Sequence, residues 1–171
     1  DLQQKKEVNI TLEQARTYFY HIALGLQAIH EIDVVHRDLK PANIMFRSDD
    51  SMAIGDFGIS KQLDSNTDLT AADSIIGTPH YMSPEQGEGK AVDIRSDIYS
   101  AGVILFELLT GERPYKGSSA AALIYKHVYS DIPKLPNDVQ HFQAIINRLL
   151  AKKPDDRYQN ATELLTALED V

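Results

Sequence analysis

The sequence predicts a mainly α-helical chain of the α+β class that carries one small β-hairpin. Two observations support this prediction. Apolar residues recur at helical spacing through most of the chain, and one stretch has short apolar runs around a polar turn. The chain has 171 residues, which is enough to bury one core without metals or crosslinks. We therefore expect a single domain over residues 1–171.

The first long helix is predicted to begin at Thr11, where T-L-E-Q offers a Thr N-cap and a Gln three residues later. Its apolar face consists of residues three or four apart: Ala15, Phe19, Ile22, Leu26 and Ile29. A second helix is expected over residues 98–109, capped by Ser96 and Asp97 and stopped at Gly111. Because this segment is apolar nearly all round, it should lie in the middle of the core.

Three further helices are predicted nearer the C-terminus. They cover residues 119–129, 139–152 and 161–170, and N-A-T-E at 160–163 offers the last one a capping box. The chain should therefore be mostly helical after its first third.

The hairpin is predicted between the first two long helices. A short strand at 34–35 comes first, followed by strands at 43–46 and 52–54 around the polar turn 47–51. Residues 61–74 are rich in Asp, Ser, Thr and Ala, which is typical of a surface loop.

The composition limits the classes of partner. Lys and Arg number 17 against 25 Asp and Glu, and the net charge of −8 argues against general binding of nucleic acid or anionic membrane. There are no cysteines, so disulfides, thiol catalysis and cysteine-ligated metals are excluded. No apolar run reaches the roughly 18 residues of a membrane-spanning helix, so no membrane segment is expected in this chain.

The catalytic residues are expected in the segment H-R-D-L-K-P-A-N, residues 36–43. This segment places Asp38, Lys40 and Asn43 on one tight loop. Phosphoryl transfer needs a carboxylate to orient the attacking hydroxyl, a cation for the transferred group and oxygen ligands for Mg²⁺. Asp56 follows the second hairpin strand, within D-F-G, and offers another oxygen ligand. Each motif is short, and their combination is the informative observation.

The chain resembles the eukaryotic-type (Hanks-type) Ser/Thr protein kinases from about Leu2 to the C-terminus, and most resembles bacterial members. H-R-D-L-K-P-A-N, D-F-G, G-T-P-H-Y-M-S-P-E at 77–85 and D-I-Y-S-A-G-V-I-L-F-E-L-L-T-G-E-R-P-Y at 97–115 follow the family's order and spacing. The resemblance implies a protein-kinase-like C-terminal lobe, with a catalytic loop at 36–43 and an activation segment at 56–85.

The resemblance also implies the site. Asp38 and Lys40 would be catalytic, and Asn43 and Asp56 would hold Mg²⁺, or Mn²⁺ in its place. Lys40, Asn43 and Asp56 would thereby also contact ATP, and Met45 would lie under the adenine ring. The alternative for Met45 is core filling. ATP and protein substrates are the expected partners, in the cytoplasm.

Other residues have supporting roles in the family. Thr78 would bridge Asp38 and Lys40 and position the substrate. Five residues would be structural: His36 and Phe57 in a hydrophobic column, Asp97 as anchor of the catalytic loop, and Glu85 paired with Arg157.

Regulation is predicted at Arg37, because a phosphate on the following loop could pair with it and order the loop. We expect Thr70 first, then Ser74 or Thr67. The alternative is that these hydroxyls merely solvate the loop.

The sequence departs from the family in two respects. Ala42 stands where many members that prefer basic peptides have a Glu, which leaves the substrate preference open, and the second departure concerns the N-terminal motifs. The sequence has no G-x-G-x-x-G loop, no V-A-I-K lysine and no Glu partner for that lysine, so the N-terminal lobe is absent and the chain alone should be essentially inactive. Two other functions remain: a scaffold module that uses the 119–129 helix, and a small-molecule phosphotransferase. The segment 77–85 disfavours the latter, because a metabolite needs no extended peptide platform.

Overall fold

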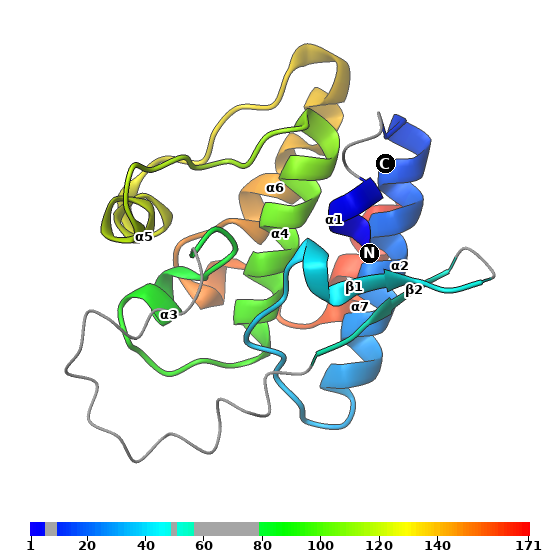
Figure 1. Ribbon diagram of the computed structural model, residues 1–171, viewed down its shortest axis with the longest axis horizontal. Helices are drawn as coiled ribbons and strands as arrows, with labels where there is room; N and C mark the ends of the chain where they lie inside the picture. Colours follow the sequence, from blue (N-terminus) through cyan, green and yellow to red (C-terminus); the bar gives the residue numbers. More distant parts are fainter. Residues whose placement is uncertain (6–9, 49–50, 57–78) are drawn as a thin grey trace.

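The computed structural model describes residues 1–5, 10–48, 51–56 and 79–171 (Figure 1). The described elements in chain order are α1 (Leu2–Lys5), α2 (Leu12–His30), η1 (Pro41–Asn43), β1 (Ile44–Phe46), β2 (Met52–Ile54), α3 (Pro84–Gly87), α4 (Ile94–Thr110), α5 (Ala120–Tyr129), η3 (Asn137–Phe142), α6 (Gln143–Leu149), η4 (Pro154–Asp156) and α7 (Ala161–Glu169). The prediction of a mainly helical chain with one two-stranded antiparallel sheet is confirmed.

Helix α4 is the centre of the core. Figure 1 shows it running through the middle of the molecule, with α2 on one side and α3 and α5 on the other. Nearly every side chain on it is buried, as its apolar sequence predicts. A Cβ added at Gly102 would lie 2.6 Å from Leu149 Cβ, so this glycine lets α4 and α6 approach closely. The helix ends as predicted at Gly111, whose φ of 75° suits a glycine.

The start of α4 differs from the prediction. The helix begins at Ile94, and its cap is Asp93, whose side chain accepts a hydrogen bond from Arg95 N. Ser96 and Asp97 lie inside the first turn and do not cap it. Their side chains instead bond to other parts of the chain, which the local pattern of residue types did not indicate.

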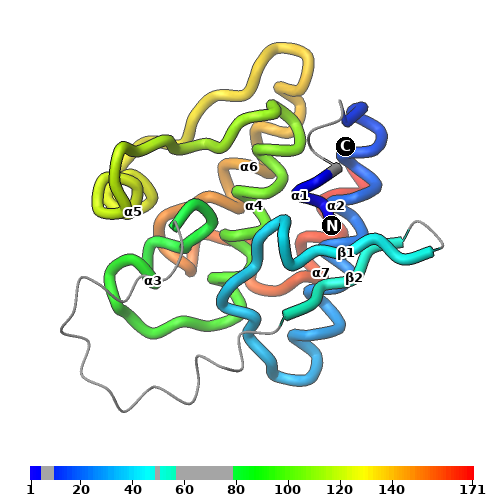
Figure 2. The backbone as a smooth tube through the Cα atoms, viewed as in Figure 1, coloured from blue at the N-terminus to red at the C-terminus, as the bar shows by residue number. Residues whose placement is uncertain are grey.

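Helix α2 begins as predicted. Thr11 and Gln14 form a reciprocal capping box, and the buried face of α2 packs against α4, α7 and β2. The rings of Tyr18 and of Phe46 in β1 pack nearly perpendicular to each other, with 5.1 Å between their centroids. The hairpin therefore lies across α2, as the tube in Figure 2 also shows.

The hairpin pairs Ile44 with Ile54 and Phe46 with Met52. Asn43 was predicted to be in the first strand but belongs to η1, where Pro41 at the first position favours a helical turn. Residues 34–35, predicted as a strand, form none in the structure. The hairpin has no third strand among the described residues, so these two residues have no sheet to pair with.

The C-terminal helices are shorter than predicted. Residues 137–142 form the 3₁₀ helix η3, and α6 ends at Leu149 rather than at residue 152. Asn160 caps α7 by accepting from Glu163 N, but Glu163 Oε2 accepts from Gln159 N and from Arg148, so the predicted capping box is only half formed. None of the helices in the described part of the chain has the length and apolar character needed to cross a membrane.

Candidate active site

The loop after α2 is held by the carboxylate of Asp97 in the first turn of α4. Asp97 Oδ2 accepts from His36 N at 2.8 Å, and Oδ1 accepts from Arg37 N at 2.9 Å. His30 Nε2 lies 3.1 Å from Oδ2. Asp97 is buried, and a buried carboxylate without donors would be costly. These contacts offset that cost and fix the backbone immediately before Asp38.

Three of the predicted site residues lie together on the next bend. Lys40 Nζ donates to Asp38 Oδ2 at 2.8 Å, and Asn43 Nδ2 donates to the Asp38 carbonyl oxygen at 2.9 Å. The backbone of Asn43 also donates to the Lys40 carbonyl, at 2.9 Å. The bend therefore brings the amine of Lys40 and the amide of Asn43 within hydrogen-bond distance of Asp38.

Asp56, the fourth predicted residue, is brought to the same bend through its neighbour Gly55. Gly55 N donates to the Asn43 carbonyl at 2.8 Å, and the Gly55 carbonyl lies 2.9 Å from His36 Nε2. Asp56 itself is exposed and has a φ of 50°, an uncommon conformation for a residue with a side chain. Its position is set by a backbone that contacts both ends of the catalytic loop.

The two ring nitrogens of His36 both contact the backbone. Because a carbonyl can only accept, Nε2 donates to the Gly55 oxygen, and Nδ1 then accepts from Asp38 N at 3.3 Å. His36 is fully buried. This arrangement supports a structural role for His36 rather than that of a base.

The side-chain oxygens at this bend are of the kind that magnesium prefers. The amide nitrogen of Asn43 is used by Asp38, which leaves Asn43 Oδ1 as the acceptor of that side chain, and Asp56 adds an exposed carboxylate. Mg²⁺ is usually bound by one or two such side chains together with substrate phosphates. Within the described ranges, no group of three or more His, Cys, Asp or Glu residues could hold a metal by itself.

Met45 lies on β1 beside this bend and is 49% exposed, whereas its neighbour Ile44 is fully buried. The core-filling alternative for Met45 is therefore wrong. The exposed thioether is available to a flat apolar ligand, which is compatible with the predicted place under an adenine ring.

Several predicted residues lie outside the described part of the chain: Phe57, Thr67, Thr70, Ser74 and Thr78. The predicted loop 61–74 lies outside it as well. Their expected roles stay predictions.

Arg37 precedes Asp38 and has a φ of 66°. Its Nε is buried and has no hydrogen-bond partner among the described residues. A buried guanidinium nitrogen without a hydrogen-bond partner favours binding of an acceptor. Binding of a phosphate acceptor is what the predicted regulatory role of Arg37 requires.

Glu85 and Arg157 form a bidentate ion pair beneath the site. Arg157 Nη1 and Nη2 donate to the two carboxylate oxygens at 2.8 and 2.7 Å, and Ser96 Oγ donates to Glu85 as well. Arg157 also donates to three backbone carbonyls, those of Ala151, Arg95 and Lys152. Burial alone would raise the pKa of Glu85, but the Arg157 and Ser96 hydrogen bonds outweigh it and lower the pKa.

A second cation, the half-buried Lys152, was not singled out from the sequence. Its Nζ donates to Tyr115 Oη at 2.9 Å and to the His127 carbonyl at 2.8 Å, at the end of α5. Burial, assisted by the charge of Arg157, lowers the pKa of Lys152 to about 8. Lys152 is the first of two consecutive lysines in the segment between α6 and η4, and such a pair gives no signal of burial.

Gln86 was also missed. Its Nε2 donates to the Arg37 carbonyl at 2.8 Å, which links α3 to the catalytic loop. The pattern S-x-x-Q at 83–86 could have predicted the capping box that Ser83 and Gln86 form at α3. The contact with Arg37 joins residues 49 positions apart, which no local pattern indicates.

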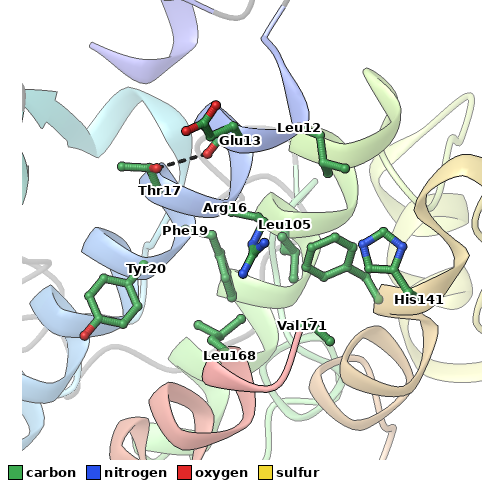
Figure 3. Close-up of a pocket in the computed structure, with 11 residues that line it drawn as sticks. Leu12, Glu13, Arg16, Thr17, Phe19, Tyr20, Leu105, His141, Leu168 and Val171 are labelled. Carbon is green, nitrogen blue, oxygen red and sulfur yellow. Dashed lines mark hydrogen bonds between the residues drawn. The ribbon is translucent and has the colours of Figure 1, made fainter.

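A cavity of about 750 Å³ lies away from this site, among α2, α4, η3 and α7 (Figure 3). Phe19, Leu105 and Leu168 form part of its wall, and Arg16 points into it. None of the predicted site residues lines it. The candidate active site is therefore distinguished by its hydrogen-bonded polar groups and not by cavity size.

Comparison with known proteins gives two findings. The sequence pattern of the family described as "Protein kinase domain" matches residues 1–167. Curated relatives include a probable serine/threonine-protein kinase of Corynebacterium efficiens, 40% identical over 91% of this chain and 25% of its own length.

Two relatives named serine/threonine-protein kinase PknB are similar. That of Mycobacterium leprae is 41% identical over 82% of this chain and 23% of its own length, and that of Mycobacterium tuberculosis is 42% identical over 84% and 24%. The chain thus spans about a quarter of the length of these relatives.

Proposed function

The chain belongs to the protein kinase domain family, in its bacterial serine/threonine branch, and on that premise we propose that it forms the larger, C-terminal lobe of an active kinase. In the whole protein this lobe transfers the γ-phosphoryl group of ATP to Ser or Thr hydroxyls of proteins. The observation that carries the proposal is the bend on which Lys40 and Asn43 both bond to Asp38.

Each polar group of the bend has a proposed role. The Asp38 carboxylate accepts or orients the proton of the substrate hydroxyl, and Lys40 stabilises negative charge on the transferred group. Asn43 and Asp56 hold Mg²⁺, which would neutralise phosphate charge when bound. The backbone bonds to Asp97 and Gly55 support these roles, because they keep the groups in fixed relative positions.

Two further contacts belong to this proposal. Met45 packs under the adenine ring, and its exposure supports this role. Thr78 bridges Asp38 and Lys40, which rests on the motif alone.

The function is tested by phosphate transfer from ATP in the full-length protein, with casein and the protein itself as acceptors. Asp38→Asn should lower the rate by at least about 10²-fold, because the carboxylate that orients the hydroxyl is lost. ATP binding should remain. Asp138→Asn, the same change at an exposed carboxylate in η3, serves as the control. Full transfer by the Asp38 variant would reject the assignment, and transfer only to metabolites would favour a small-molecule phosphotransferase.

The 171 residues contain neither the phosphate-covering loop nor the lysine that anchors ATP in this family, so we propose that this chain alone is essentially inactive. Turnover of about 1–100 s⁻¹ by the purified 171-residue chain would contradict this. We also place the lobe in the cytoplasm, because its proposed co-substrate is ATP.

Regulation by phosphorylation is proposed at Arg37. The buried Nε without a described partner supports binding of a phosphate carried by Thr70, or by Ser74 or Thr67. Mass spectrometry of the active protein should find phosphate at one of these residues, and Thr70→Ala should lower activity. Full activity of a protein that carries no phosphate there would contradict the proposal.

A scaffold function is the second candidate, and one observation favours it. Tyr125 and Tyr129 on α5 are 62% and 66% exposed, and their rings lie 4.9 Å apart. Exposed aromatic pairs are common in protein interfaces. Partner capture that Asp38→Asn leaves unchanged, in a protein without phosphotransfer, would support the scaffold over the kinase.

A further inference from the structure

The backbone of Arg37 is held in an unfavourable conformation directly before the proposed catalytic aspartate. Its φ of 66° lies in the left-handed region, which is unfavourable for a residue with a Cβ because the Cβ approaches the following carbonyl oxygen. Such a conformation persists only where neighbouring groups impose it. The structure shows one group on each side of Arg37: Asp97 accepts from its N–H, and Gln86 donates to its carbonyl oxygen.

The amide of Gln86 is fixed at its other end. Its Oε1 accepts from Ser83 N at 3.0 Å and from Ser83 Oγ at 3.1 Å, at the buried N-cap of α3. With the oxygen used there, the Nε2 atom is directed at the Arg37 carbonyl, 2.8 Å away. The side chain is therefore oriented before it meets the catalytic loop, and little freedom is lost in making the contact.

We propose that Gln86 is a positioning residue for phosphotransfer. The Arg37 carbonyl and the Asp38 N–H belong to one planar peptide unit. A donor that fixes the direction of this oxygen therefore fixes the plane from which the Asp38 side chain departs. Asp97 from α4 and Gln86 from α3 clamp Arg37 from both sides, and the clamp sets Asp38. This inference rests on the proposed kinase function.

The test uses Gln86→Glu in the full-length protein. A glutamate keeps the acceptor oxygens for Ser83, since S-x-x-E is also a capping box, but it cannot donate to the Arg37 carbonyl. We expect kcat to fall about 10- to 100-fold, because small misplacements of reacting groups have effects of this size. The KM for ATP and the melting temperature should stay near their wild-type values, because the hydrogen bonds of the Gln86 side chain within the described residues go to Ser83 and to Arg37 and not to a proposed nucleotide-binding residue.

Gln143 offers a matched control. Its Oε1 accepts from Leu135 N at 2.7 Å, and its Nε2 donates to Asn147 Oδ1 at 2.8 Å and lies 3.4 Å from the Pro133 carbonyl, so its amide joins neighbouring segments as that of Gln86 does, without a hydrogen bond to the described catalytic loop. Gln143→Glu should leave kcat unchanged. Gln86→Met, which removes the donor without adding charge, should lower kcat as Gln86→Glu does.

A second readout does not depend on activity. Amide hydrogen exchange of a peptide covering residues 36–40 should be faster in Gln86→Glu than in the wild type and in Gln143→Glu. If the wild-type protein transfers no phosphate, the proposed function fails, and hydrogen exchange alone then decides whether Gln86 holds the loop. Unchanged kcat with unchanged exchange would overturn the proposal. An equal loss of kcat, ATP affinity and melting temperature would also overturn it, since that is the result of general destabilisation.

Discussion

Two carboxylate–cation pairs of this molecule have similar lengths and different surroundings. Asp38 and Lys40 lie 2.8 Å apart with side chains 35% and 40% exposed, whereas Glu85 and Arg157 lie 2.7 Å apart with side chains 5% and 0% exposed. In the exposed pair, Lys40 Nζ donates to one carboxylate oxygen of Asp38. The buried pair is bidentate and adds Ser96 and three backbone carbonyls.

The comparison separates groups that are available to a substrate from groups that hold the scaffold. An exposed pair contributes little to stability, roughly 0–1 kcal/mol, and its charges can turn to a ligand without leaving a buried charge behind. A buried pair is different, because removal of one partner leaves the other without solvent or counter-charge. Hydrogen-bond length alone does not distinguish the two cases, and burial does.

The largest effect on stability is expected for Arg157→Ala. The change leaves the Glu85 carboxylate buried and unpaired and frees three backbone carbonyls, so the free energy of unfolding should fall by about 3–5 kcal/mol. Urea denaturation of the full-length protein measures this. Lys116→Ala, which breaks an exposed pair with Glu112, should change it by less than about 1 kcal/mol. Equal losses of unfolding free energy in the two variants would show that burial does not decide how much an ion pair contributes to stability.

Asp97→Asn should have the next largest effect. The amide that replaces one oxygen cannot accept, so the N–H of His36 or of Arg37 loses its acceptor, and the free energy of unfolding should fall by about 1–3 kcal/mol. Activity should fall as well, because the same bonds position Asp38. A variant with wild-type stability and activity would show that Asp97 does not anchor the loop.

The contribution of Glu85 should depend on pH. Its folded-state pKa lies below the ordinary value of 4.5, so its stabilising contribution is fully present above about pH 4.5. It is lost as the pH falls through the folded pKa. Melting temperatures of the wild type and of Glu85→Gln, compared from pH 7 down to pH 3, should therefore converge at the acid end. Parallel curves would contradict the lowered pKa.

Lys40→Met should have the smallest effect on stability and a large one on activity. We expect the free energy of unfolding to change by less than about 1 kcal/mol and phosphotransfer to fall about 10²-fold. Lys90 is a matched control, because it pairs with a carboxylate two residues away, Glu88, at the same 2.8 Å. Lys90→Met should leave both quantities unchanged. Full phosphotransfer by Lys40→Met would remove Lys40 from the proposed catalytic groups.

Much of the fold could be predicted because the signals are local. Helical spacing and the T-L-E-Q cap located α2, and Gly111 located the end of α4. The errors lie where competing contacts decide. Asp97 was expected both to cap α4 and to anchor the catalytic loop, and it bonds to the loop but does not cap the helix. Glu163 bonds to Gln159 and Arg148 instead of completing its capping box.

The sequence predicted the polar residues of the catalytic loop better than the residues that contact this loop from other segments. Asp38, Lys40 and Asn43 occur within six consecutive residues, so their proximity follows from chain connectivity. Gln86 and Lys152 could not be found in this way, because their partners are distant in the sequence. The motifs therefore indicated the groups proposed to react and, through the family resemblance, the supporting residues Asp97, Glu85 and Arg157, but they did not indicate Gln86 or Lys152.

By itself the sequence determined the family, the helical class and the residue types at the proposed site, because these depend on periodicity and on short, ordered motifs. Only the tertiary structure decided that Gln86 joins the expected anchor Asp97 in holding Arg37, and that Arg157 of the expected Glu85–Arg157 pair is fully buried. The physical reason is that burial and long-range hydrogen bonds depend on which segments pack together. The type of a side chain limits the partners it can bind, and the packing of the segments determines which of these partners it meets.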